Sequence, residues 1–145
     1  MHIFLGLGTN LGDREMNLVT ARDLLMKHDV LVMGQSEIRE TEPLGGLDQP
    51  KYLNQVIECS TELDPFALLE VCKQVEREMG RPVPLGNVSF GAKKEWASRI
   101  IDIDILLYGD EKIDTPNLKI PHYDNANRQF VIDGIRDIDK TAIFT

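Results

Sequence analysis

Residues 99–107 read Arg-Ile-Ile-Asp-Ile-Asp-Ile-Leu-Leu, an apolar, β-branched run that predicts a strand carrying two acids. Because alternate residues of a strand point to the same face, we expect Asp102 and Asp104 to lie side by side. Two carboxylates in such surroundings repel each other unless a positive group lies between them. Mg²⁺ with oxygen ligands meets that need, and Arg99 suits a phosphate held by the metal. The alternative is that both aspartates are simply solvated on a half-exposed sheet.

Composition limits the class of protein. The chain has 145 residues, 42% of them hydrophobic and 28% charged, so we expect one domain spanning 1–145. The net charge of −8 argues against nucleic acid as a partner. Cys59 and Cys72 have neither metal-ligand nor disulfide-rich spacing, which favours free thiols in a reducing compartment. Without a signal-peptide pattern or an apolar run long enough to span a membrane, we expect a cytoplasmic monomer that does not bind membranes.

Apolar patterns and turn signals predict the order of elements. Four strands are expected, at 2–7, 30–39, 52–63 and 100–108. Helices are expected from about 13, from 65 to 79, and from about 125 to 135. The middle helix is the best marked, because Asp64 can cap it, Pro65 suits its first position and Gly80 suits its exit. The order β-α-β-β-α-β predicts an α+β fold of the ferredoxin-like type, a mostly antiparallel sheet with helices packed on it.

The segment 81–98 is long and has no clear periodicity. Its cations outnumber its acids in a chain of negative net charge, so we expect it to receive an anion. Lys93 and Lys94 taken alone are equally consistent with a solvated loop. Trp96, the one tryptophan, offers an aromatic face to a planar ligand, although packing on the core would also explain it.

Glycine motifs narrow the chemistry. The chain has no G-x-x-x-x-G-K-[ST] loop, and Gly6, Gly8 and Gly12 have the wrong spacing for a dinucleotide fingerprint. We expect these glycines to form a tight turn that lets Thr9 and Asn10 approach a ligand through their backbone. No serine or cysteine sits in a nucleophile elbow. The remaining acids, arginines and aromatic residues fit phosphoryl-type transfer, in which positioning and electrostatics do most of the catalysis.

Collinear motifs covering nearly the whole chain resemble the 6-hydroxymethyl-7,8-dihydropterin pyrophosphokinase family of folate biosynthesis. The matching blocks are 4–13, 41–45, 49–54, 76–81, 99–109 and 121–124, followed by Arg128 and Phe130. The blocks 99–109 and 121–124 together are highly specific. The resemblance implies that the pterin hydroxymethyl oxygen attacks the β-phosphorus of ATP, giving AMP and the pterin pyrophosphate.

The resemblance also implies roles for particular residues. Two Mg²⁺ ions would be held by Asp102 and Asp104, which with Arg81 and Arg99 would form the catalytic group. The residues expected to bind ATP are Glu76, Arg81, Arg99, His122, Tyr123 and Arg128. The residues expected to form the pterin pocket are Thr41, Leu44, Tyr52, Asn54, Trp96 and Phe130. Taken singly, many of these have ordinary explanations: an aromatic in the core, a histidine in a turn, a glutamate on a helix surface, or Arg128 paired with Asp124.

The sequence departs from the family pattern at three places, and three other functions remain as alternatives. Ala97-Ser98 stands where the family commonly has Gly-Pro, 82–94 is longer than in compact members, and 132–138 diverges, so we expect a slightly smaller domain. One alternative function is a sensor that binds nucleotide or pterin without turnover. Another is a protein-interaction domain with an acidic surface. A third is γ-phosphoryl transfer, which would release ADP in place of AMP.

Overall fold

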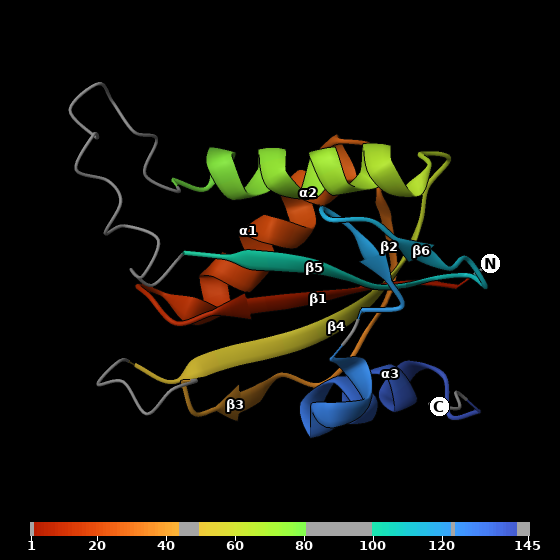
Figure 1. Cartoon of the computed structure of the whole chain (residues 1–145). Helices are drawn as coiled ribbons and strands as arrows, with labels where there is room; N and C mark the ends of the chain where they lie inside the picture. The colour runs from red at the N-terminus through yellow and green to blue at the C-terminus, as the bar shows by residue number, and fades with distance from the viewer. Residues whose placement is uncertain (1, 44–49, 81–99, 123, 142–145) are drawn as a thin grey trace.

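The computed structural model describes residues 2–43, 50–80, 100–122 and 124–141. Its centre is an antiparallel sheet in the order β2-β4-β1-β5, with β3 also paired to β4 (Figure 1). The strands of this sheet are β1 (Ile3–Thr9), β2 (Leu31–Gln35), β3 (Arg39–Thr41), β4 (Tyr52–Ser60) and β5 (Asp102–Tyr108). The order of elements and the antiparallel pairing confirm the α+β prediction and are compatible with the ferredoxin-like arrangement.

Three α-helices accompany the sheet in the part of the chain that the structure describes. They are α1 (Arg14–Lys27), α2 (Pro65–Glu78) and α3 (Gln129–Ile138). As expected, the side chain of Asp64 caps α2 by accepting from the backbone N–H of Ala67, and Pro65 occupies the first turn. Asp13 caps α1 in the same way through the N–H of Met16. In the part of the chain that is described, no helix is both long and apolar enough to cross a membrane.

The structure corrects three details of the predicted elements. The strand expected at 30–39 is two strands, because Ser36 leaves the ladder and bonds to Val56 through both its N–H and its hydroxyl. The helix expected at 125–135 begins later: a 3₁₀ turn (Asn125–Asn127) is followed by extended Arg128 and then by α3. A small hairpin of β6 (Ile113–Asp114) and β7 (Lys119–Ile120) was not predicted.

The two faces of the sheet are covered differently. Figure 1 shows α1 and α2 on one side of the sheet and α3 on the other. Beneath α1 and α2 lies the larger core, to which the strands contribute Ile3, Leu5, Leu7, Ile57, Cys59, Ile103 and Ile105. Beneath α3 lies a smaller core of Phe4, Val56, Leu106, Val131 and Ile135. The buried strand residues beneath α3 therefore occupy only part of that face, and the predicted acids follow on the same face.

Candidate active site

The predicted acid pair lies on the face that α3 covers in part. Asp102 and Asp104 are half-buried, whereas Ile103 and Ile105 between and beside them are buried in the larger core. In the register of β5 with β1, Asp102 lies opposite Gly8 and Asp104 lies opposite Gly6. Because the strand neighbours are glycines, no side chain of β1 stands beside either carboxylate.

The two glycines also face β4, where Gly8 lies opposite Asn54 and Gly6 opposite Val56. A Cβ added to Gly8 would lie 3.2 Å from Asn54 Oδ1, and one added to Gly6 would lie 3.3 Å from a methyl of Leu106. The prediction that these glycines form a tight turn is wrong for Gly6 and Gly8, which lie inside β1, whereas Gly12 has a φ of +68° in the bend before α1. Because neither Gly6 nor Gly8 carries a side chain, those of Leu106 and Asn54 pack close to the backbone of β1.

Glu76 supports the acid-bearing strand from α2. Only 6% of Glu76 is exposed, and its carboxylate accepts a hydrogen bond of 2.8 Å from the backbone N–H of Ile103. Among the described residues β5 is the last strand of the sheet, and no described strand pairs with an N–H on its outer side. Glu76 supplies that partner at the residue between Asp102 and Asp104, and thereby fixes the strand at the acid pair.

His122 is anchored next to β5. Its backbone N–H donates to the carbonyl of Leu106 at 3.0 Å, and the side-chain amide of Asn125 donates to the same oxygen at 2.9 Å. Burial lowers the pKa of His122; the carboxylate of Asp104 opposes this shift and Arg128 reinforces it. The structure therefore brings His122 into the electrostatic surroundings of Asp104, although the two lie on different elements.

Arg128 joins the same group of side chains. Its guanidinium lies 3.3 Å from Nδ1 of His122 and 3.8 Å from a carboxylate oxygen of Asp124. The Arg128 guanidinium carbon also lies 5.4 Å from the centre of the Phe130 ring, within the range of a cation–π contact. The pairing of Arg128 with Asp124, expected as an ordinary helix contact, is present together with the contact to His122.

Three of the residues expected to bind a pterin lie together on β3 and β4. Thr41 pairs with Tyr52, and the side-chain amide of Asn54 donates to the hydroxyl of Thr41 at 2.7 Å. The ring of Tyr52 comes within 3.8 Å of the position that a Cβ on Gly8 would take. Phe130 is partly buried and packs against the core beneath α3.

Other predicted residues cannot be placed. Leu44, Arg81, Trp96, Arg99 and Tyr123 lie outside the described residues, as do Lys93, Lys94 and the Ala97-Ser98 departure. Sequence reasoning also missed Asn125, whose buried amide holds the segment of His122 on β5. An asparagine shortly after the Pro-His-Tyr-Asp block carries no signal of burial in the sequence.

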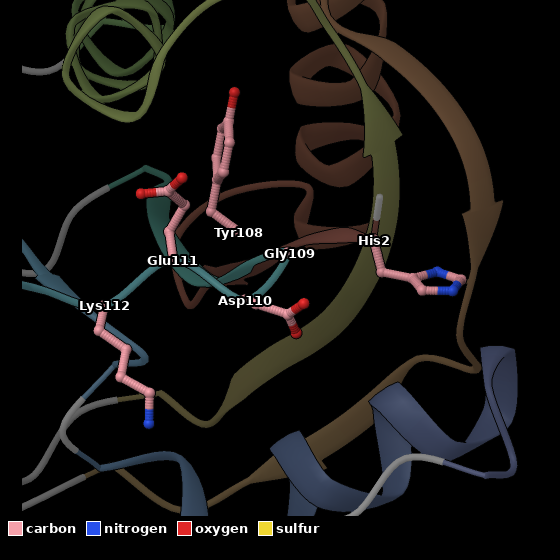
Figure 2. Close-up of a pocket in the computed structure, with 6 residues that line it drawn as sticks. All are labelled: His2, Tyr108, Gly109, Asp110, Glu111 and Lys112. Atoms are coloured by element: carbon pink, nitrogen blue, oxygen red, sulfur yellow. The ribbon is translucent and has the colours of Figure 1, made fainter.

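A pocket of about 580 Å³ lies at the other end of β5. It is lined by His2, Tyr108, Gly109, Asp110, Glu111 and Lys112. Figure 2 shows these side chains pointing in different directions, whereas a ligand site needs polar groups that converge. Within the described ranges, no group of three or more His, Cys, Asp or Glu residues could hold a metal ion. The acid pair is the better candidate, because its two carboxylates lie on the same face of β5 whereas the side chains of the pocket diverge.

Comparisons with known proteins bear on this surface. Residues 4–140 match the model of the family described as 7,8-dihydro-6-hydroxymethylpterin-pyrophosphokinase (HPPK). The 2-amino-4-hydroxy-6-hydroxymethyldihydropteridine pyrophosphokinase of Bacillus subtilis (strain 168) is 40% identical over 136 residues, which are 93% of this chain and 76% of the relative. The protein of the same name from Haemophilus influenzae is 38% identical over 130 residues, 89% of this chain and 76% of the relative.

A solved structure shows the same fold. It is a crystal structure of an HPPK-DHPS in complex with substrates, and it matches with a TM-score of 0.68 at 14% sequence identity. The match covers 94% of this chain but 40% of that larger chain. At this identity the likeness concerns the arrangement of helices and strands.

Proposed function

The chain belongs to the 7,8-dihydro-6-hydroxymethylpterin-pyrophosphokinase family, and we infer that it acts by the reaction of that family. It is an enzyme of folate biosynthesis, a 2-amino-4-hydroxy-6-hydroxymethyldihydropteridine diphosphokinase with ATP as co-substrate. It transfers a pyrophosphoryl group from ATP to the hydroxymethyl group of 6-hydroxymethyl-7,8-dihydropterin, which leaves AMP. The observation that carries the site is the acid pair Asp102 and Asp104 beside two glycines of β1.

The acid pair fits Mg²⁺, and two ions are proposed. Asp102 and Asp104 offer carboxylate oxygens from one face of a strand whose backbone is fixed by Glu76. Mg²⁺ prefers oxygen ligands and usually takes one or two carboxylates, with waters and substrate phosphates completing the octahedron. When bound, the ions would neutralise charge on the phosphate oxygens. Gly6 and Gly8, the strand neighbours of the two acids, add no side chain of their own beside the carboxylates.

Nucleotide binding is proposed for Glu76, Arg81, Arg99, His122, Tyr123 and Arg128. In this group His122 has a defined protonation. Burial lowers its pKa, which favours the neutral ring, and Nδ1 accepts from the backbone N–H of Asp124 at 3.2 Å. The proton therefore lies on Nε2, from which His122 would donate to a phosphate oxygen.

Pterin binding is proposed for Thr41, Leu44, Tyr52, Asn54, Trp96 and Phe130. The hydrogen bond from Nδ2 of Asn54 to Thr41 fixes the side-chain amide, so that Oδ1 faces Gly8. An amide oxygen held in this way can accept from the N–H edge of a pterin. The ring of Tyr52, also beside Gly8, supplies an aromatic face for the flat heterocycle.

Catalysis in this site is mainly positioning and electrostatic stabilisation. A loose phosphoryl-type transition state needs little covalent help from the protein and does not require a strong general base. Among the proposed catalytic residues, Arg99 is the one that most directly neutralises the transferred group. We expect Arg99→Ala to raise the barrier by about 3–4 kcal/mol, as for removal of one preorganised positive group. Full activity in that variant would take Arg99 off the catalytic list.

The organisation of the protein is also proposed. Residues 1–145 form one pyrophosphokinase domain, in which β1, β2, β4 and β5 contribute side chains to the packed cores on the two faces of one sheet. The protein acts as a cytoplasmic monomer on small-molecule substrates. The strongly negative net charge supports the exclusion of nucleic acid as a partner.

The test is an assay with ATP, Mg²⁺ and 6-hydroxymethyl-7,8-dihydropterin that resolves AMP from ADP. Pterin-dependent AMP is the expected product. The matched control is 6-methyl-7,8-dihydropterin, which has the same ring but no oxygen to accept the group, and should give no AMP. Release of ADP would indicate γ-phosphoryl transfer, binding of both ligands without turnover would indicate a sensor, and binding of neither would favour an interaction domain.

A further inference from the structure

Thr9 and Asn10, at the end of β1, have buried side chains. Their exposed fractions are 0% and 1%, although polar residues at the end of a strand are usually solvated. The sequence led us to expect that they approach a ligand through their backbone. In the structure their side chains instead make hydrogen bonds to segments far away in the chain, and these bonds go to both halves of the candidate site.

Thr9 is bound to the stem of β5. Its hydroxyl donates to the carbonyl of Ile100 at 2.5 Å, across 91 residues of sequence. The side chain of Asn17, on α1, donates to the same hydroxyl at 3.1 Å and to the carbonyl of Leu11 at 2.7 Å. The hydroxyl of Thr9 is therefore both donor and acceptor in a chain of bonds that ends two residues before Asp102.

Asn10 is bound to the stem of β4. Its side-chain amide donates to the carbonyl of Pro50 at 3.1 Å, two residues before Tyr52. Arg14, the first residue of α1, adds a second bond by donating to the carbonyl of Lys51 at 2.8 Å. Thr9, the last residue of β1, thus holds the start of the acid-bearing strand, and Asn10, which follows β1, holds the start of the pterin-side strand.

We infer that Thr9 and Asn10 are positioning residues for the two substrates, Thr9 for the nucleotide side and Asn10 for the pterin side. This inference rests on the proposed function. The reaction joins an oxygen of one substrate to a phosphorus of the other, so the distance between the two half-sites decides whether they meet, and a misplacement of about 1 Å can cost a hundredfold in rate. Both half-sites take their position from the same end of β1.

The positions of the two bonds also predict which substrate's binding is affected when each bond is lost. Pro50 and Ile100 directly follow 44–49 and 81–99 in the sequence, and these segments contain the predicted residues Leu44, Trp96 and Arg99. If a bond only satisfies buried polar groups, its loss should weaken the binding of both substrates equally or of neither. If a bond positions one half-site, its loss should weaken the binding of one substrate only.

The experiment compares Thr9→Val, which keeps the shape of the side chain but loses the hydroxyl, with Asn10→Leu. Dissociation constants for the pterin and for the Mg²⁺ complex of α,β-methylene-ATP are measured by calorimetry, and KM and kcat by AMP release. We expect Thr9→Val to weaken nucleotide binding by about tenfold and to change pterin binding little. Asn10→Leu should weaken pterin binding by about tenfold and change nucleotide binding little. The conservative variant Thr9→Ser should restore nucleotide binding.

Thr61→Val is the matched control. Thr61 makes an equivalent hydroxyl-to-carbonyl bond of 3.0 Å to Asp29, away from the candidate site, so its loss should leave both dissociation constants unchanged. If Thr9→Val or Asn10→Leu does not fold, Arg14→Ala takes its place, because it removes the bond to Lys51 from a partly exposed side chain and should weaken the pterin alone.

Each outcome has one meaning. Equal weakening of both ligands in folded variants, or no change in either, would overturn the positioning roles while leaving the pyrophosphokinase activity of the unmodified protein in place. An unmodified protein that binds both ligands but forms no AMP would instead overturn the proposed function, and the selectivity of binding in the variants would still decide the positioning roles.

Discussion

The two halves of β5 make opposite use of the same alternation. Asp102, Asp104 and Leu106 occupy alternate positions of one strand, yet the first two are half-buried acids and the third is buried beneath α3. The neighbouring strand β1 changes in the same way, from Phe4 under the helix to Gly6 beyond it. What differs between the halves is the helix, because an apolar side chain is stabilising only where another element covers it. The candidate active-site surface therefore begins where the small core ends.

This comparison predicts that activity and stability separate along one face. Asp102→Asn or Asp104→Asn should lower kcat by about a thousandfold or more, because each removes a charged metal ligand that supplies several kcal/mol of transition-state stabilisation. The free energy of unfolding in urea should stay within about 0.5 kcal/mol of the original, since the site is not needed for folding. AMP release and urea unfolding measure the two quantities. Asp110→Asn, an exposed acid just past the end of β5, is the control and should change neither.

The covered half should show the reverse pattern. Leu106→Ala removes a side chain that is 1% exposed, and should lower the free energy of unfolding by about 2–5 kcal/mol through lost burial and a cavity. The folded fraction should keep kcat within a few-fold. Leu31→Ala, at a side chain that is 49% exposed, is the control and should have little effect. A loss of turnover in folded Leu106→Ala as large as in Asp102→Asn would break the comparison.

The close packing of α3 on the sheet gives a further test of the comparison between the covered and uncovered halves of β5. A Cβ at Gly134 would lie 2.4 Å from Cγ2 of Val56, so Gly134→Ala must displace the helix. Alanine gains about 1 kcal/mol in helix propensity, but overpacking costs about 1–3 kcal/mol, so a net loss of roughly 1 kcal/mol in thermal unfolding is expected. In the background of Val56→Ala the same substitution should become neutral or stabilising. A gain in stability from Gly134→Ala alone would show that α3 is less tightly seated.

The smallest effect concerns the ion pair that ties α3 to the sheet. Asp137 lies 2.8 Å from the guanidinium of Arg39 and accepts from the backbone N–H of Glu37 at 3.1 Å. The hydrogen bond from Arg39 is the main cause that lowers the pKa of Asp137, so its stabilisation is complete above the unfolded value and is lost as pH falls through the lower folded value. Asp137→Asn should cost less than about 1 kcal/mol at neutral pH. Urea unfolding should show this difference shrinking in acid, and a difference that grows would contradict it.

Sequence reasoning predicted those features that depend on local pattern. The shared face of Asp102 and Asp104 follows from strand alternation, and the start of α2 follows from Asp64 and Pro65. It failed where a partner strand decides the outcome. Gly6 and Gly8 resemble a turn when read alone, and only the register with β4 and β5 shows why a strand carries them.

The break between β2 and β3 was unpredictable for a similar reason. It depends on hydrogen bonds from Ser36 to Val56, a tertiary contact without a local sequence signal. Glu76 is the same kind of case, because its place on a helix predicts a solvated charge, while the structure buries it against the N–H of Ile103. Burial of a single polar residue depends on what the fold brings next to it.

The bond between Glu76 and Ile103 has a consequence for self-association. An edge strand with free N–H groups is a template on which another chain can add a strand, and β5 ends the sheet. The carboxylate of Glu76 occupies one of these groups between two acids, so an incoming strand would meet a filled donor and repelling charge. At the other edge, β2 exposes Leu31 and Met33 but is interrupted by an irregular register between Val32 and Gly34. Both edges thus disfavour the growth of the sheet from one molecule into the next.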